Sequence, residues 1–177
     1  MEKLLATFRK KFLQKTADKR LSFLPYFKYF NSIPDEQKYE LFFNAWCRLE
    51  YGFHYITEEF IKELMLYPRP PINIPGYEGQ NELVVYRGMG SESNHVKQAL
   101  SWTTEIDKAM WFAKRWCSYG AAKVYQAKID ISNIVGYIDD REESEVIVLP
   151  SCLMDVTKIA RVTKDGEVKH LNSRKAG

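Results

Sequence analysis

The spacing of hydrophobic side chains predicts helices in the N-terminal part of the chain. Over residues 1–15, apolar residues recur every three or four positions with Lys and Arg between them, which is the pattern of an amphipathic helix. A second helix is predicted to begin after Pro34, because proline suits a first helical turn and Asp35 and Glu36 favour the positive end of the helix dipole. A third helix is predicted to begin near Thr57.

The pattern changes to short strands after a proline-rich join at residues 68–81. Its run Pro68-Arg-Pro-Pro-Ile-Asn-Ile-Pro75 removes backbone donors and forces extended geometry on its neighbours. Beyond the join, strands are predicted at residues 83–86, 124–131, 134–138, 145–149 and 156–162, and Asp165-Gly166 predicts a hairpin turn before a last strand at residues 168–171. Since helices come first and strands follow, the predicted fold class is α+β.

One helix is predicted between the first two of these strands. Thr104 is placed to cap it, and Asp107 completes a weaker form of a capping box. The buried stripe of this helix is predicted to consist of Ile106, Ala109, Ala113 and Trp116.

Composition and charge limit the class of protein. With 177 residues, 45% of them hydrophobic, the chain can build a core without disulfides or metal, so residues 1–67, the join and residues 82–177 are predicted to form one compact unit. The three widely spaced cysteines and three scattered histidines fit neither a disulfide framework nor a metal site.

Charges interrupt every apolar stretch and no cleavable leader is evident, which predicts a cytoplasmic protein without membrane contact. The formal net charge of +3 is too slight to indicate a nucleic-acid partner.

Three short motifs carry the candidate chemistry. Arg87 ends an apolar strand, Ser101 lies in Leu-Ser-Trp-Thr before the predicted helix, and Glu145 begins a strand in Glu-Ser-Glu-Val-Ile-Val. In this order, and with Phe112-Ala113 after the serine, they resemble the arginine–serine–glutamate branch of the ADP-ribosyltransferase family. The resemblance covers residues 82–171 and does not explain the N-terminal helical region, residues 1–67.

The resemblance implies an ADP-ribosyltransferase-like β-sandwich core after the N-terminal helical region, with NAD as substrate. It implies that Arg87 contacts the NAD phosphates, that Ser101 orients Glu145, and that Glu145 engages the nicotinamide ribose. A guanidinium suits a pyrophosphate because its donors are forked, and a fixed carboxylate stabilises the positive charge that develops on the sugar as nicotinamide leaves. Gly88, next to Arg87, is expected to let the backbone approach the ligand closely.

A second carboxylate and a changed triplet complete the candidate site. Glu143 and Glu145 are two residues apart, so in an extended segment both side chains would point to one face. In the family, the earlier glutamate of such a pair is associated with modification of arginine, which implies a catalytic role for Glu143 at the acceptor. The family's common serine–threonine–serine triplet is altered here, because Trp102 is its middle residue and Thr103 its last. Thr103 keeps a hydroxyl at the NAD site, whereas Trp102 either stacks near nicotinamide or packs in the core.

The expected activity is transfer of ADP-ribose from NAD to a macromolecule, with an arginine side chain of a protein as the favoured acceptor. Two alternatives stay open. The chain is an NAD glycohydrolase if water is the acceptor, or a non-enzymatic module that binds a nucleotide or a protein, such as a phage anti-defence protein. Small proteins of this family occur as bacterial toxins and bacteriophage products, which would place this one in the host cytoplasm.

Overall fold

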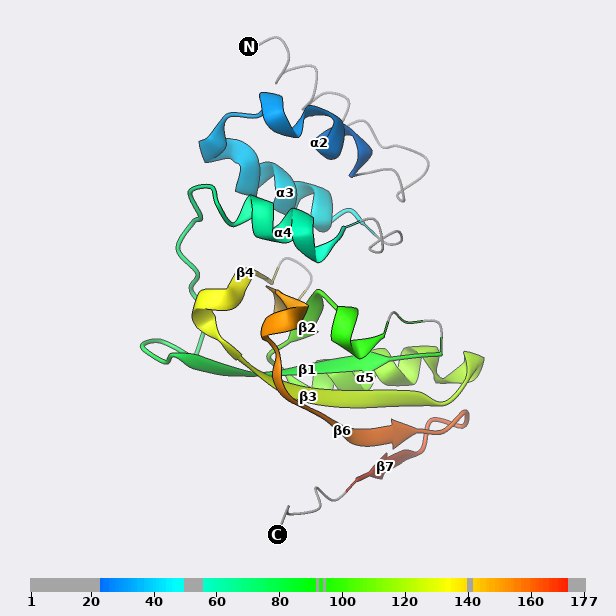
Figure 1. The fold of residues 1–177 in the computed structure, drawn as a ribbon. Coiled ribbons are helices and arrows are strands. Elements are labelled where there is room, and N and C mark those ends of the chain that lie inside the picture. The colour runs from blue at the N-terminus through cyan, green and yellow to red at the C-terminus, as the bar shows by residue number, and fades with distance from the viewer. Residues whose placement is uncertain (1–22, 50–55, 92, 94, 140–141, 172–177) are drawn as a thin grey trace. The chain divides into compact units, whose positions relative to one another are not determined.

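The chain divides into two compact units, residues 1–71 and 72–177. The computed structural model describes residues 23–49, 56–91, 93, 95–139 and 142–171 (Figure 1). The prediction of one compact unit is therefore wrong, because the helical unit and the unit that contains the strands each bury their own hydrophobic residues. The amphipathic helix predicted at residues 1–15 lies outside the described residues.

Three α-helices are described in the first unit: α2 (Leu24–Tyr29), α3 (Lys38–Trp46) and α4 (Glu58–Leu64). The two predicted helices are confirmed, α3 with a 3-10 turn, Asp35–Gln37, directly after Pro34. The Thr57 hydroxyl caps α4 by accepting the Phe60 N–H at 3.2 Å. The six-residue α2 was not predicted, because a helix of this length is too short to show a clear periodicity.

Lys38 is a buried charge in the aromatic core of the first unit, with 2% of its surface exposed. Its Nζ donates to the Phe30 and Ile33 carbonyls, both at 2.9 Å, and lies 4.4 Å from the centre of the Tyr67 ring. An ion pair with the exposed Asp35 carboxylate spans 3.4 Å. The ammonium thereby replaces its lost hydration with fixed partners, as a buried charge requires.

The second unit is built on a seven-stranded antiparallel sheet. Its order is β4-β5-β2-β1-β3-β6-β7, and every predicted strand is present. The strands are β1 (Glu82–Met89), β2 (Ser101–Thr103), β3 (Ala122–Asp130), β4 (Ile134–Ile138), β5 (Glu145–Val148), β6 (Met154–Val162) and β7 (Val168–His170). The predicted α+β class is therefore confirmed.

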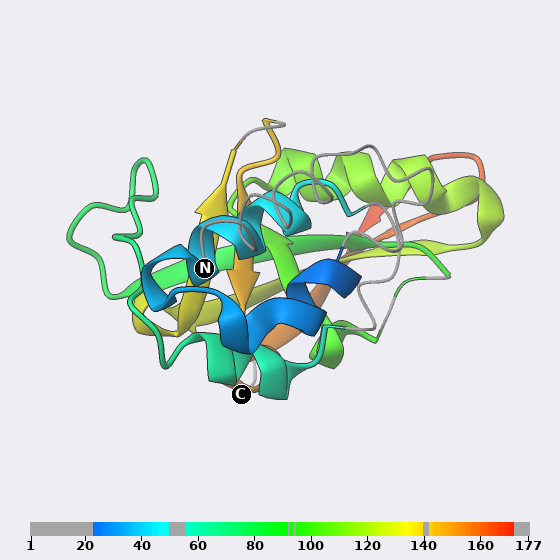
Figure 2. The ribbon, with the colours of Figure 1, turned by 90° about the horizontal axis from the view of Figure 1, so that it is seen from above.

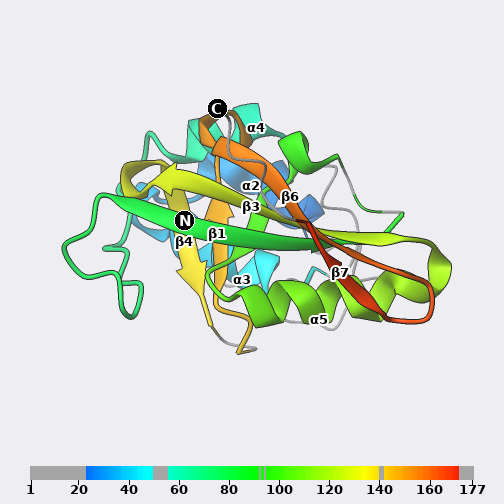
Figure 3. The same ribbon diagram turned by 90° about the horizontal axis from the view of Figure 1, so that it is seen from below.

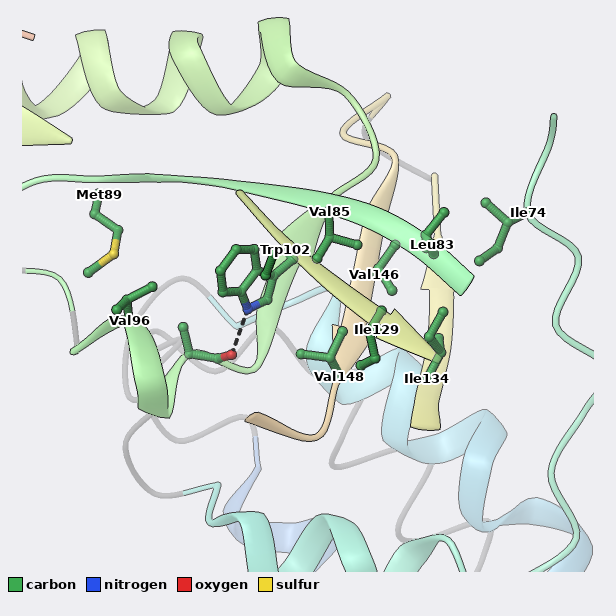
Figure 4. Packing of buried hydrophobic residues seen from close by; sticks show 12 residues of the cluster. Ile74, Leu83, Val85, Met89, Val96, Trp102, Ile129, Ile134, Val146 and Val148 are labelled. Atoms are coloured by element: carbon green, nitrogen blue, oxygen red, sulfur yellow. Dashed lines mark hydrogen bonds between the residues drawn. The ribbon is translucent and has the colours of Figure 1, made fainter. Parts of the chain in front are cut away.

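The predicted β-sandwich is replaced by one sheet that folds over its own core. β1 and β2 pair through Tyr86 and Thr103 alone among their described residues. Beyond this pair, β4 runs across the direction of β1 and β3 (Figure 3). The halves β4-β5-β2 and β1-β3-β6-β7 stay hydrogen-bonded to each other, and apolar side chains from both, including Val85, Trp102 and Val148, fill the space that they enclose (Figure 4).

Helix α5 (Ile106–Trp116) covers the opposite face of β1 and β3. Its inner face consists of small residues, Ala109 and Ala113, which pack against Val124 and Ala160. Seen from above, α5 runs along β1 and β3 (Figure 2). The prediction of a longer buried stripe is wrong, because Ile106 and Trp116 at the ends are 39% and 40% exposed.

The start of α5 also differs from the prediction. The N-cap residue is Glu105, one position after Thr104, and the hydroxyl that accepts the Glu105 N–H at 3.1 Å is that of Thr103. The capping box of Thr104 and Asp107 is therefore wrong by one residue. Among the described helices, none is both long and apolar enough to span a lipid bilayer.

Candidate active site at the fold of the sheet

Three adjacent strands bring together the three residues at the centre of the resemblance. β5, β2 and β1 are neighbours in the sheet, and they carry Glu145, Ser101 and Arg87. Glu145 and Ser101 each begin their strand, and the register sets Glu145 opposite Thr103. Arg87 and Glu145 are 58 positions apart along the chain. They meet because β2 has β1 as its neighbour on one side and β5 on the other.

Two hydrogen bonds connect the three residues, one through the Ser101 side chain and one through its backbone carbonyl. The Ser101 hydroxyl donates to Glu145 Oε1 at 2.5 Å. Arg87 Nη1 donates to the backbone carbonyl of Ser101. Glu145 is 6% exposed, so its carboxylate is held in one position by the protein and not by bulk water.

Arg87 carries a charge in a dry environment. Burial lowers the pKa of Arg87 to about 10, and the negative charge of Glu145 opposes this shift. The guanidinium remains charged near neutral pH, but its Nε is buried and has no hydrogen-bond partner among the described residues. An unused donor on a buried cation is costly, and such groups concentrate at functional sites.

Strained backbone precedes Glu145. Glu142 and Ser144 have positive φ angles of 54° and 46°, a left-handed conformation that is uncommon for residues with a side chain. The cost, of order 1–3 kcal/mol for each such residue, persists only where surrounding contacts hold the segment. The segment before β5 is therefore held in one conformation by its contacts.

Those contacts join the segment to α5 and to the end of β4. The Ser144 hydroxyl donates to the Glu105 carboxylate at the start of α5, and the Ser144 N–H donates to Asp139 Oδ1 at 2.9 Å. The Thr103 hydroxyl donates to the Glu143 carbonyl at 2.8 Å. Ser144, Glu105 and Asp139 thereby hold the backbone from which Glu145 enters β5.

No protein-family model, curated protein or solved structure matches this chain. The described residues contain no group of three or more His, Cys, Asp or Glu side chains that could hold a metal ion.

Two residues expected at the NAD site have other roles. Trp102 is 2% exposed in the core, and its ring N–H donates to the Ala99 carbonyl at 2.9 Å, so the core-packing alternative is confirmed. Alternation along β2 explains this, because Ser101 and Thr103 point to the face opposite Trp102. Gly88 faces α5 and not a ligand: a β-carbon there would lie 2.0 Å from the Ala109 carbonyl oxygen.

The expectations for Thr103 and Glu143 also change. Thr103 is 5% exposed, and its hydroxyl serves both α5 and the segment before β5, so its contacts are structural. Glu143 and Glu145 were predicted to share a face of an extended segment. That argument is wrong, because Ser144 between them is left-handed and β5 begins only at Glu145. Glu143 is half-buried beside the site.

No pattern in the sequence indicates Ser144, Glu105 or Asp139 as positioning residues. Ser144 lies inside the Glu-Ser-Glu motif, where its spacing alone indicates no role. Glu105 follows β2 and Asp139 follows β4, and both of these strands pair with β5, which brings the two segments together at Ser144.

Proposed function

We propose that this chain is an NAD-dependent mono-ADP-ribosyltransferase whose favoured acceptor is an arginine side chain of a protein. The observation that carries the proposal is the hydrogen-bonded chain from Arg87 through Ser101 to Glu145. It brings the three motif residues together, which supports the proposed roles of Arg87 as a cation for phosphate and of Glu145 as a fixed carboxylate for the ribose.

Arg87 is suited to hold the pyrophosphate of NAD. Its Nη1 is engaged with Ser101, whereas its buried Nε has no hydrogen-bond partner among the described residues. A phosphate oxygen is an acceptor that would complete this donor set and compensate the cost of burying the guanidinium.

Glu145 is suited to stabilise the reacting sugar. As the bond between nicotinamide and the ribose C1′ breaks, its electron pair leaves with neutral nicotinamide and positive charge develops on the ribose. The Ser101 hydroxyl fixes the carboxylate that faces this charge. The acceptor guanidinium then forms a bond from nitrogen to C1′ and releases one proton. Glu143 is our candidate for receiving it.

The test follows nicotinamide release and label transfer after incubation of the purified chain with labelled NAD, with and without a cell lysate. We expect label on a protein, and we expect Glu145→Gln to abolish both signals, because the substitution is nearly isosteric but removes the charge. Full activity of Glu145→Gln would refute the assignment. Nicotinamide release without label would identify the glycohydrolase alternative. The absence of both signals would favour the binding module.

A matched pair of variants separates the roles of the neighbouring glutamates. Glu143→Gln is expected to lose label transfer while it retains nicotinamide release, since it acts on the acceptor and not on the ribose. Glu142→Gln, at the exposed neighbouring position, should change neither reaction. Equal effects of the two substitutions would remove Glu143 from the mechanism.

A further inference from the structure

The sequence of α5 has nearly the same chemical pattern in both directions from Trp111. It reads Ile106-Asp-Lys-Ala-Met-Trp-Phe-Ala-Lys-Arg-Trp116. Positions at equal distances from Trp111 carry, from the centre outwards, two apolar residues, two alanines, two lysines, a pair of opposite charges and again two apolar residues. When two copies of such a helix pack antiparallel with Trp111 at the two-fold axis, residues at equal distances from Trp111 lie at the same level. The pattern is therefore suited to pairing with a second copy of itself.

The outer face of α5 carries three exposed residues, Asp107, Trp111 and Arg115, which we call the α5 stripe. They follow one another at intervals of four positions, so they lie on one side of the helix. Ala109 and Ala113 form the opposite side, which packs on the sheet. The Trp111 ring is 52% exposed at the centre of the stripe. Since tryptophan and arginine are enriched among the residues that dominate protein interfaces, the composition of the stripe is typical of a docking surface.

The two charges of the α5 stripe have no ion-pair partner within the described part of the chain. Asp107 and Arg115 are eight positions apart, beyond the three or four at which helical side chains meet, and neither takes part in an ion pair of the described residues. The Arg115 guanidinium lies 5.4 Å from the centre of the Trp111 ring and 5.2 Å from that of Trp116. Stacking uses the flat face of a guanidinium, and the donors at its edge stay available for a carboxylate.

An antiparallel second copy would satisfy both charges. Asp107 of each copy would lie at the level of Arg115 of the other, and the symmetry would form this ion pair twice. The two Trp111 rings would meet at the axis, where their apolar surface is removed from water. Lys108 and Lys114 would set like charges at the same level, but long lysine side chains can turn their ammonium groups to solvent. A wholly acidic or wholly basic partner would match only one end of the stripe, so the charges favour a second copy of the chain.

We propose that two copies of this chain associate through the α5 stripe, with a two-fold axis beside Trp111. The interface is small, because a helix of 11 residues is only about 16 Å long. Small interfaces are weak, so the expected dissociation constant lies in the micromolar range. Gly88 faces α5, and the neighbouring residue of β1, Arg87, therefore points to the other face of the sheet. The dimer thus leaves the candidate site on the sheet face away from the second copy, and the inference stands independently of the proposed transferase activity.

Sedimentation velocity of the full chain, from micromolar to millimolar concentration, tests the association. The wild type should change from monomer to dimer within this range. Trp111→Ala should raise the dissociation constant about 30-fold or more, which is the effect of losing a residue that dominates an interface. Met154→Ser is the matched control: it removes an exposed apolar side chain from β6 of the same unit, so the dissociation constant should not change.

Exchange of the charges tests the antiparallel direction. Asp107→Arg and Arg115→Glu, each folded by circular dichroism, should stay monomeric alone, because each substitution sets like charges at the same level twice. An equimolar mixture of the two variants should recover the dimer, because each charge of one variant then meets the opposite charge of the other.

Three outcomes would overturn the proposal. One is a wild type that is monomeric at every concentration. Another is a dimer that persists in Trp111→Ala and in both charge variants, which would place the interface elsewhere. The third is loss of the dimer in the folded charge variants without recovery on mixing, which would exclude the antiparallel pairing.

Discussion

The hydrogen bond between Ser101 and Glu145 makes the most direct prediction about the site. Ser101→Ala removes a hydroxyl that donates at 2.5 Å to a carboxylate with 6% exposure. A hydrogen bond to a charged group contributes about 1.5–3 kcal/mol, and a buried carboxylate that loses a donor is not rehydrated. We therefore expect the free energy of unfolding of the second unit to fall by about 1.5–3 kcal/mol.

A double-mutant cycle isolates this interaction from the other effects of each substitution. The four proteins are the wild type, Ser101→Ala, Glu145→Gln and the double variant, and the coupling energy between the two positions should lie in the range given above. Urea unfolding is followed by tryptophan fluorescence. Since Trp46 belongs to the first unit, it is replaced by Phe in all four proteins, so that the remaining tryptophans report on the second unit.

The same cycle applies to catalysis. If Ser101 acts by positioning Glu145, its removal should lower the rate of nicotinamide release by roughly 10- to 150-fold, which corresponds to the same free energy at about 1.4 kcal/mol for each tenfold change. In the Glu145→Gln background it should have little further effect. A coupling energy below about 0.5 kcal/mol, together with additive losses of activity, would show that the short hydrogen bond does not position the carboxylate.

Four further predictions concern burial, packing and charge. Trp102→Ala should lower the free energy of unfolding by about 3–5 kcal/mol in urea titrations, since the residue lies in the core and not at the ligand. Gly88→Ala should cost about 3 kcal/mol or more by the same measurement, because its methyl group would collide with the Ala109 carbonyl. Lys38→Met should destabilise the first unit by about 1–3 kcal/mol in thermal unfolding, because it removes the donor from the buried Ile33 carbonyl, whereas the Phe30 carbonyl still accepts the Ile33 N–H at 3.2 Å. Since burial lowers the pKa of Arg87 to about 10, NAD affinity measured by titration calorimetry should be constant near neutral pH and fall as the pH rises through that value, whereas Arg87→Met should bind weakly at every pH.

Secondary structure followed from the sequence wherever an element was long enough to show a period. The strand at Ile134–Ile138 has the predicted bounds. The predicted pair Asp165-Gly166 completes the turn before β7, in which the Gly166 N–H donates to the Thr163 carbonyl at 3.0 Å and Gly166 has a φ of 82°. The strand β2 was missed because three residues cannot show an alternation. The division into two units was missed because composition limits how much core a chain can build but not how many cores it forms.

The motifs identified the residues that meet, but not the way in which they are supported. Order along the chain was sufficient to select Arg87, Ser101 and Glu145, which the structure brings together. Alternation then failed at Glu143, because a left-handed residue interrupts the segment before β5. The role of Ser144 depends on contacts between distant segments, which a single sequence does not reveal.

The position of the site follows from the way the sheet folds. A straight ladder from the pair of Tyr86 and Thr103 would set Ser101 opposite Gly88, but the described pairing between β1 and β2 ends at the first pair. Because the strands part there, the Ser101 carbonyl accepts the Arg87 side chain in place of a backbone amide of β1. On its other side β2 remains in register with β5, which holds the Ser101 hydroxyl within reach of Glu145. Because β1 and β2 separate at this point, the three-residue strand β2 has the Arg87 cation on one side and the Glu145 carboxylate on the other.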